Sequence, residues 1–304
     1  MTGGPEETPA GGVTSNASSA SDAVDAGIRG PFPEAPTHLV RSQDGTPIAV
    51  FEAGNDGPRP PLILVHGATA DHTTFRAVAP LFGRSRRLLA IDRRGRGASG
   101  DAATYAIERE FEDIAAVAED AAVRFGGPVD VLGHSYGGRC ALGASLLGEA
   151  IRKVVAYEGA PVPAGSSYRP DRLLEAVRAS LARGDPDAAL SGFLAGVVGM
   201  SDAELARYRA EPVWPARVAA AHTILRELEA ETSPPASIEA LASVQVPVLL
   251  ILGGSSRSPF GVGTRAFADR LAHAEVVMIE GAAHAAHHTH VAEFVAAVEA
   301  FLDR

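Results

Sequence analysis

The sequence predicts an α/β fold with a mostly parallel, doubly wound sheet and a helical insertion over one sheet edge. Short, continuous apolar runs alternate with helical patterns over most of the chain. The alternation stops over residues 159–244, which hold several helical patterns and no convincing strand. It then resumes until the end of the chain. A stretch of about 85 residues is too long for a plain connecting loop, so it predicts an insertion with its own structure.

The composition divides the 304 residues into three parts. Residues 1–34 are rich in Gly, Ala, Ser, Thr and Pro, and they predict a disordered tail because they bury too little apolar surface to fold. Residues 35–158 and 245–304 form the predicted α/β core, and residues 159–244 form a helical lid. We expect the lid to cover the carboxyl edge of the sheet, where ligands bind in such folds.

Charge and composition exclude several classes of function. A net charge of −10 with scattered arginines disfavours nucleic-acid binding, which needs a basic stripe. No apolar run reaches the roughly 18 residues of a membrane span, and the first residues lack the basic and apolar regions of a secretory signal. The single cysteine, Cys140, cannot form an intrachain disulfide, and we expect it to be packed in the core. We therefore expect a cytoplasmic protein; an oligomer is compatible with the sequence.

The first half of the predicted core begins with a β-hairpin. THLVRSQ and PIAVFEA flank Asp44 and Gly45, a dipeptide typical of hairpin turns. RPPLILVHG is a continuous apolar run, which suits a strand covered on both faces. DHTTFRAVAPLF then predicts one helix and RRLLAID the next strand. Residues 106–125 predict a longer helix, because their apolar side chains recur at helical spacing.

The second half repeats strand and helix on both sides of the insertion. PVDVLG predicts a strand that is followed at once by the helix RCALGASLLGEA, and KVVAYE predicts the next strand. After the insertion come the strand VPVLLIL, the helix TRAFADRLAHA, the strand EVVMIE and the helix VAEFVAAVEAFL. Strands that alternate with helices in this way form a parallel sheet with helices on both faces.

A serine lies on the turn between the strand PVDVL and its helix. Residues 133–137 read GHSYG and match the pattern G-x-S-x-G. The turn is so tight that glycines are needed where side chains would clash. It lifts the Ser135 hydroxyl clear of the sheet and points the helix N-terminus towards it. The pattern in this context predicts Ser135 as a nucleophile; the alternative is a glycine-rich turn with an inert serine.

With these motifs the chain resembles the α/β-hydrolase family over about residues 36–304. The resemblance rests on LVHGATADHTTF, DRRGRGASG, GHSYGG and EGAAHAAHH, which follow one another in the family's order. It implies that His284 is the catalytic base and that the backbone N–H groups of Ala68 and Tyr136 form an oxyanion hole. It says little about the substrate, because this fold hosts many chemistries. A serine at the nucleophile position argues against epoxide hydrolases and dehalogenases of this fold, which use Asp there.

The carboxylate that should orient His284 is missing from its common position. Residues 253–257, after the strand VPVLLIL, read GGSSR, and Asp269 lies within a helix on a solvated face. Glu158 ends the strand KVVAYE, beside the strand that carries Ser135. Some α/β-hydrolases, zearalenone-type lactonases among them, carry their acid at this point, and the additional methylene of Glu gives the reach. We predict Glu158 as the acid.

An alternative gives Glu158 a structural role. It would then bind backbone amides of the lid or a loop, and a weaker Ser–His dyad would do the chemistry. A serine hydroxyl would orient His284 in that case, from one of Ser255, Ser256 and Ser258.

Further residues are candidates for substrate contact or for support of the loops. Thr69 is a candidate hydroxyl donor, and Trp214 is the first candidate for substrate contact in the lid because Pro212 and Pro215 make its surroundings rigid. The remaining candidate contacts are Phe193, Met200 and His288. We expect structural roles for His66 and Asp92.

No metal site is expected. The histidine cluster around His287, with His288 and His290, raises that alternative, but it has no Cys and no matched carboxylate nearby.

These observations predict hydrolysis of a carboxylic ester or lactone through an acyl-enzyme, without a cofactor. The lid favours a small apolar substrate. Two alternatives stay open: the same fold used for C–C bond hydrolysis, acyl transfer or a cofactor-free lyase step, and a non-catalytic protein that binds a ligand.

Overall fold

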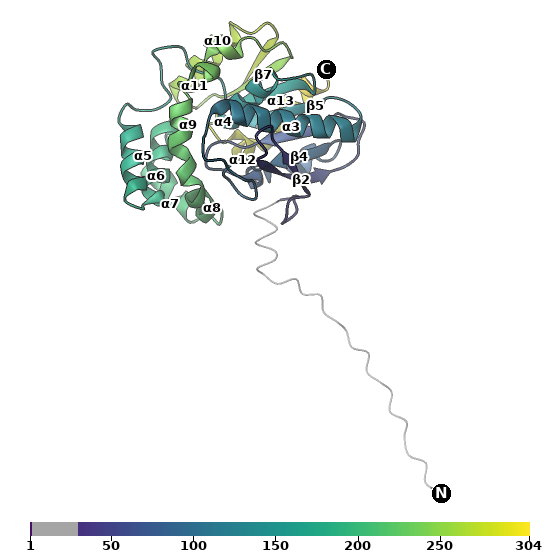
Figure 1. Ribbon diagram of the computed structural model, residues 1–304, viewed down its shortest axis with the longest axis horizontal. Coiled ribbons are helices and arrows are strands. Elements are labelled where there is room, and N and C mark those ends of the chain that lie inside the picture. Colours follow the sequence, from purple (N-terminus) through teal and green to yellow (C-terminus); the bar gives the residue numbers. More distant parts are fainter. Residues whose placement is uncertain (2–29) are drawn as a thin grey trace.

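The computed structural model describes Met1 and residues 30–304 (Figure 1). Most of the expected disordered tail, residues 1–34, lies outside the described residues. Its last part, residues 30–34, is described. Phe32 is buried in the core, and its ring meets the ring of His72 edge-on at 6.0 Å between centroids. The chain therefore packs onto the domain before residue 35.

The core of the fold is an eight-stranded sheet in the order β1-β2-β4-β3-β5-β6-β7-β8. β1 pairs antiparallel with β2, and β2 with β4, whereas the other neighbours are parallel. The predicted mostly parallel α/β sheet is thus confirmed. The strands are β1 (His38–Arg41), β2 (Pro47–Gly54), β3 (Leu62–Val65), β4 (Arg87–Ile91), β5 (Val129–His134), β6 (Ile151–Tyr157), β7 (Val248–Gly253) and β8 (Ala274–Ile279).

Helices cover both faces of this sheet. Apolar side chains of α3, α4 and α11 pack on one face, and those of η1, α2 and α13 on the other. The central strands β3 and β7 are buried along their whole length, which explains why they read as continuous apolar runs. The helices of the core are η1 (His72–Phe75), α2 (Ala79–Phe82), α3 (Ile107–Phe125), α4 (Tyr136–Ala144), α11 (Ser258–Ala268), α12 (Ala286–Thr289) and α13 (Val291–Leu302).

Three helices differ from the sequence prediction. α4 covers Tyr136–Ala144, whereas RCALGASLLGEA predicts a helix over residues 139–150. The single helix expected over DHTTFRAVAPLF is divided into η1 and α2, because Pro80 has no N–H for a continuous helix and its ring would clash with the preceding turn. α11 begins at Ser258 instead of Thr264, with Pro259 in its first turn. Proline is favoured there because the first N–H groups of a helix have no partner within it.

The segment between β6 and β7 contains helices and, within its described residues, no strand. Its helices α5 to α9 lie together on one side of the sheet (Figure 1). They share an apolar core of their own, which reaches Leu252 and Phe260 at the sheet edge. The elements of this segment are α5 (Leu173–Ala182), α6 (Pro186–Phe193), η2 (Leu194–Val198), α7 (Asp202–Arg209), α8 (Trp214–Ala219), η3 (Ala220–Thr223), α9 (Ile224–Ala230), η4 (Pro234–Ala236) and α10 (Ile238–Leu241). No described helix has the length and apolar character needed to cross a bilayer.

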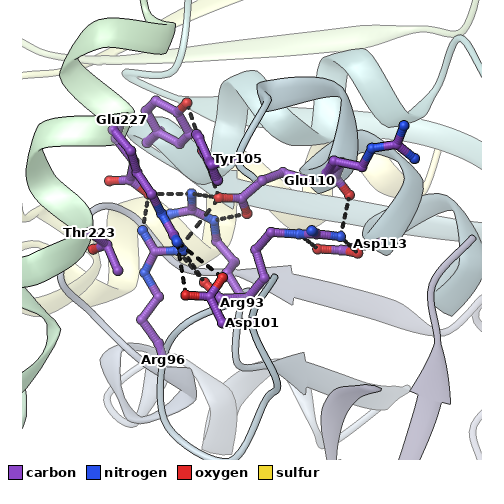
Figure 2. A network of polar contacts seen from close by, with 12 residues as sticks. Arg93, Arg96, Asp101, Tyr105, Glu110, Asp113, Thr223 and Glu227 are labelled. Carbon is purple, nitrogen blue, oxygen red and sulfur yellow. Dashed lines mark hydrogen bonds and ion pairs between the residues drawn. The ribbon is translucent and has the colours of Figure 1, made fainter. Parts of the chain in front are cut away.

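A buried ion-pair network joins this helical segment to the core (Figure 2). Arg93 donates to both oxygens of Glu110, at 2.7 and 2.9 Å, and to Oε1 of Glu227 on α9 at 2.5 Å. Arg96 donates to the same oxygen of Glu227. Burial alone would raise the pKa of Glu110, but the two arginines outweigh it and hold that pKa at about 2. The four side chains are almost fully buried, so their charges depend on one another.

Replacing Glu227 with Gln should destabilise the protein strongly. The substitution keeps the size of the side chain but leaves Arg93 and Arg96 with less compensating charge in a buried site. We expect a loss of about 3 kcal/mol in the free energy of unfolding. The matched control is Glu229→Gln on the same helix, where an exposed carboxylate pairs with exposed Arg178, and its effect should stay below about 0.5 kcal/mol. Urea unfolding of both variants checks this, and equal effects would contradict it.

Candidate functional site

Ser135 lies on a strained turn between β5 and α4. Its backbone has φ 54° and ψ −125°, a region that side-chain-bearing residues rarely adopt. The neighbouring glycines permit the turn: a Cβ on Gly137 would lie 2.3 Å from the backbone oxygen of His66, and one on Gly133 would lie 2.4 Å from the oxygen of Gly137. The turn leaves the Ser135 side chain partly exposed in a cavity beside the sheet edge.

Glu158 and His284 meet at the same edge of the sheet. Nδ1 of His284 lies 2.5 Å from Oε2 of Glu158, and the backbone N–H of Gly253 donates to Oε1 at 2.8 Å. Glu158 directly follows β6 and has φ 48°, so its side chain leaves the strand end in a second left-handed turn. Both side chains are buried. The carboxylate is thus fixed through one oxygen and contacts the imidazole through the other.

Ser135 and His284 line the same cavity, although no hydrogen bond joins the serine hydroxyl to that ring in the described chain. Hydrogen bonds between catalytic groups are often long without a substrate and shorten when it binds. The face of the His284 ring stacks on Phe260, with centroids 4.6 Å apart. The ring therefore has defined support besides Glu158.

Two residues that the sequence did not single out hold the loop before α12. His134 Nε2 is 2.9 Å from the carbonyl oxygen of His284, and the Tyr157 hydroxyl donates to the carbonyl of Ala283. The same hydroxyl accepts from the N–H of Ala286 at 2.9 Å. Desolvation and the nearby His284 lower the pKa of His134 well below its usual value, so it is a neutral donor. The sequence does mark these two residues, because His134 directly precedes Ser135 and Tyr157 directly precedes Glu158, so each lies at the same strand end as a predicted site residue.

The two N–H groups expected to form an oxyanion hole flank Ser135. Tyr136 is the first residue of α4, and Ala68 lines the cavity. A Cβ on Gly67 would lie 3.1 Å from the Cβ of Ser135, which shows how closely the loop after β3 passes the serine. Among the described residues, neither the N–H of Ala68 nor that of Tyr136 donates a hydrogen bond. Both are available to a ligand atom.

The cavity has a volume of about 490 Å³ and lies between the helical segment and the carboxyl edge of the sheet. The expected contacts Phe193, Met200 and His288 line it together with Ser135 and His284. Leu194, Val197 and Val198 of η2 add further apolar wall. The site thus has a serine hydroxyl, an imidazole paired with a carboxylate, and free N–H groups in one largely apolar space.

The family comparison agrees with this geometry. The family model described as the alpha/beta hydrolase family matches residues 62–298, which is most of the chain. The chain belongs to the alpha/beta hydrolase family. No curated protein matches it.

Solved structures resemble this alpha/beta hydrolase over nearly their whole length. An alpha/beta hydrolase from Sphaerobacter thermophilus is 30% identical, with a TM-score of 0.70, over 84% of this chain and 99% of that one. A hydrolase from Pseudomonas aeruginosa is 24% identical, with a TM-score of 0.72, over 88% and 98% of the two chains. The enol-lactonase from Burkholderia xenovorans is 18% identical, with a TM-score of 0.67, over 88% and 100%. The last two likenesses show the fold alone.

Two of the expected substrate contacts in this hydrolase do not line the cavity. Trp214 does not line the cavity: its indole N–H donates to Asp187 at 2.8 Å, and its ring packs edge-on against Tyr208 inside the helical segment. Thr69 is buried, and its hydroxyl donates to the carbonyl of Ala68 at 2.7 Å instead of facing a ligand. The polar group of each side chain is thus already hydrogen-bonded within the protein, to Asp187 in one case and to Ala68 in the other.

The residues expected to support the loops of this hydrolase do so. Oδ1 of Asp92 accepts from the backbone and ring nitrogens of His72, at 2.9 and 2.8 Å, and Oδ2 accepts from the N–H of Ala98. The ring of His66 accepts from the N–H of Arg93 at 3.0 Å. Cys140 is fully buried, and burial raises the pKa of its thiol. Within the described chain, no group of three His, Cys, Asp or Glu side chains is placed to hold a metal ion.

Cavity residues that sequence reasoning missed include Arg76, Tyr208, Glu211 and Arg217. Arg76 follows η1, and the other three come from the helical segment. No motif marks them, because their place at the cavity depends on how separate helices pack.

Gly137→Ala should damage the fold and the serine turn together. The new Cβ would lie 2.3 and 2.5 Å from the backbone oxygens of His66 and Val65, neither of which can move without displacing β3. We expect a loss of about 3 kcal/mol or more. Gly192→Ala is the control, since a Cβ there meets nothing within 4 Å in α6, and it should stabilise by about 0.5 kcal/mol. Denaturant unfolding measures both, and a stable Gly137→Ala variant would refute this account of the turn.

Proposed function

We propose that this alpha/beta hydrolase cleaves a carboxylic ester or a lactone through a Ser135–His284–Glu158 triad. The contact between Glu158 Oε2 and His284 Nδ1, 2.5 Å long and at the wall of the cavity that holds Ser135, carries the proposal. Chain order and elements agree, because the serine follows β5, the acid follows β6, and the histidine follows β8. The role of Ser135 is further supported by its strained turn.

Acylation begins with a proton transfer. Nδ1 of His284 carries a hydrogen and donates a hydrogen bond to Glu158. Nε2 is therefore free to take the proton of the Ser135 hydroxyl as the serine oxygen attacks the substrate carbonyl. The carbonyl oxygen becomes negative, and the N–H groups of Ala68 and Tyr136 donate to it. Each such donor typically lowers the barrier by about 3 kcal/mol. His284 then gives its proton to the leaving alkoxide, which departs as an alcohol or, in a lactone, stays attached as a hydroxyl.

Deacylation repeats the sequence with water. His284 takes a proton from the water as its oxygen attacks the acyl-enzyme, and the same N–H groups hold the new oxyanion. The proton then returns to the Ser135 oxygen, and the carboxylic acid leaves. The Glu158 carboxylate stabilises the imidazolium that forms in both halves.

The position of Glu158 serves orientation as well as charge. Gly253 fixes one carboxylate oxygen, so the other has a single direction in which to meet the imidazole. This contact selects the tautomer with hydrogen on Nδ1, which is the one that leaves Nε2 basic. Solved structures with this fold include proteins described as esterases and an enol-lactonase, which supports ester chemistry for the same architecture.

Glu158→Gln should abolish activity more completely than its small change in size suggests. The amide oxygen must face the N–H of Gly253, because the amide nitrogen would leave that donor unpaired. The NH₂ group then faces His284 and forces hydrogen onto Nε2, so the base is lost. We expect kcat to fall by about 10⁴ on an activated aryl ester, as it does when such a tautomer is lost.

The controls separate this from general damage. Asp269→Asn changes an exposed carboxylate just after α11 and should leave kcat unchanged. Ser135→Ala should remove both turnover and the burst of aryl alcohol that reports acylation. Substantial activity in Glu158→Gln would show that another group orients His284, and wild-type protein that turns over no ester or lactone faster than Ser135→Ala would refute the proposed function.

A further inference from the structure

Two arginines face the cavity. Arg217 comes from α8 in the helical segment, and Arg76 follows η1 in the core. Both line the cavity that holds Ser135 and His284, and both are partly exposed. The rest of the wall is largely apolar, with Phe193, the residues of η2 and Met200. Both guanidinium groups keep contact with solvent and stand in a largely apolar wall, so an anionic group of a ligand can pair with them there.

No carboxylate neutralises these arginines in the described chain. Nη1 of Arg217 is 3.4 Å from the carbonyl oxygen of Ala68, and Nη2 is 3.5 Å from the hydroxyl of Thr74. Nη1 of Arg76 is 3.4 Å from the carbonyl of Thr73. These are long contacts to neutral acceptors and use few of the five donors that each guanidinium has. Most donors remain available for a ligand.

The buried arginines of the core show the opposite pattern. Arg93 and Arg96 share Glu110 and Glu227, and Arg94 makes a bidentate pair with Asp113 at 2.7 Å for both contacts. The chain thus has carboxylates for the arginines that it buries. Arg76 and Arg217 differ from these buried arginines, because no carboxylate pairs with either of them within the described residues.

The other titratable groups of the cavity leave its charge positive. Burial, followed by the neighbouring Arg76 and Arg217, lowers the pKa of His288 to about 4, and burial together with nearby charges also lowers the pKa of His134 and His287. These imidazoles are therefore neutral near pH 7. Glu211 is the one carboxylate on the wall; it is exposed and forms no ion pair with either arginine within the described residues.

We propose that the substrate carries a free carboxylate that binds Arg217 and Arg76 while its ester or lactone carbonyl lies at Ser135. The proposal rests on the proposed function and adds the substrate class: a carboxylate-bearing ester or lactone with an otherwise apolar body. Arg217 contacts the backbone carbonyl oxygen of Ala68. The N–H group of Ala68 belongs to the proposed oxyanion hole, so an anionic group on Arg217 binds near the substrate carbonyl that reacts. Guanidinium groups pair well with planar carboxylates.

The probes are pairs of aryl esters that differ only in charge. One is the mono-aryl ester of adipic or pimelic acid, and its partner carries a carboxamide in place of the carboxylate. A second pair places the carboxylate or carboxamide on the aryl leaving group. In one of these pairs the wild type should prefer the anionic ester by roughly 10- to 100-fold in kcat/KM, the range expected for a charge-assisted hydrogen bond. Ser135→Ala gives the background rate.

Variants assign the preference to the two arginines. Arg217→Met, and the double variant with Arg76→Met, should lower kcat/KM for the anionic ester far more than for the neutral one, so that the ratio approaches one. Arg217→Lys should retain part of the preference. Arg207→Met, an exposed arginine of α7 that does not line the cavity, should leave the ratio as it is. Glu211→Gln should keep or increase the ratio, because it removes a negative charge from the wall.

A binding measurement makes the test independent of turnover. Ser135→Ala should bind the anionic ester more tightly than its amide partner by calorimetry, and adding Arg217→Met should remove the difference. If neither ester is hydrolysed but this difference is seen, the proposed function fails and the anion site stands. Equal binding and equal turnover of both partners in every pair, or a preference that survives loss of both arginines, would overturn the inference.

Discussion

Two left-handed turns at the ends of neighbouring parallel strands determine the arrangement of the site. β5 and β6 pair in register up to His134 and Tyr157, and the next residues, Ser135 and Glu158, have φ values of 54° and 48°. A non-glycine residue in such a conformation costs on the order of 1–3 kcal/mol. The cost is offset by the rest of the sheet, because Ser135 N–H donates to Tyr157 O and Glu158 N–H to Ile251 O. Strand pairing thus holds the side chains of Ser135 and Glu158 at one edge of the sheet.

The sequence predicts the position of a cavity residue when that residue directly follows a strand of the sheet, and it does not when the residue lies on a helix of the insertion. Ser135 and His284 follow strands within recognisable motifs, and Glu158 was predicted because a strand end adjacent to Ser135 brings its side chain to the same edge. Arg217 could not be found in this way, since no strand register fixes where a helix of the insertion lies. The same reason applies to Trp214, which was expected to contact substrate. Pro212 and Pro215 make the backbone around it rigid, but they do not determine the direction in which its ring packs.

The fold was predicted well where local pattern and tertiary packing agree. β3 and β7 are apolar because both faces are covered, and α3 was predicted to within one residue. The single helix expected after β3 is wrong, because Pro80 interrupts a stretch whose apolar periodicity is helical. The expected tail, residues 1–34, includes Phe32, whose ring is buried in the core. The residues next to Phe32 in the sequence are Pro and Gly, which are typical of a disordered segment.

The arginines of this protein separate into two groups that do different work. Arg93 lies under the ring of Tyr136, 4.8 Å from its centroid, and reaches Glu227 of α9, so one buried cation contacts both the serine turn and the helical segment. Buried ion pairs of this kind add little net stability but fix one arrangement, because any other leaves a charge unpaired. Arg217 lies on that same helical segment. Arg93 and Arg96 pair with Glu227 of this segment, and they therefore help to hold Arg217 at the wall of the cavity that Ser135 also lines. The net charge of −10 does not oppose an anion there, since screening acts over about 8 Å in physiological salt and leaves the nearest charges dominant.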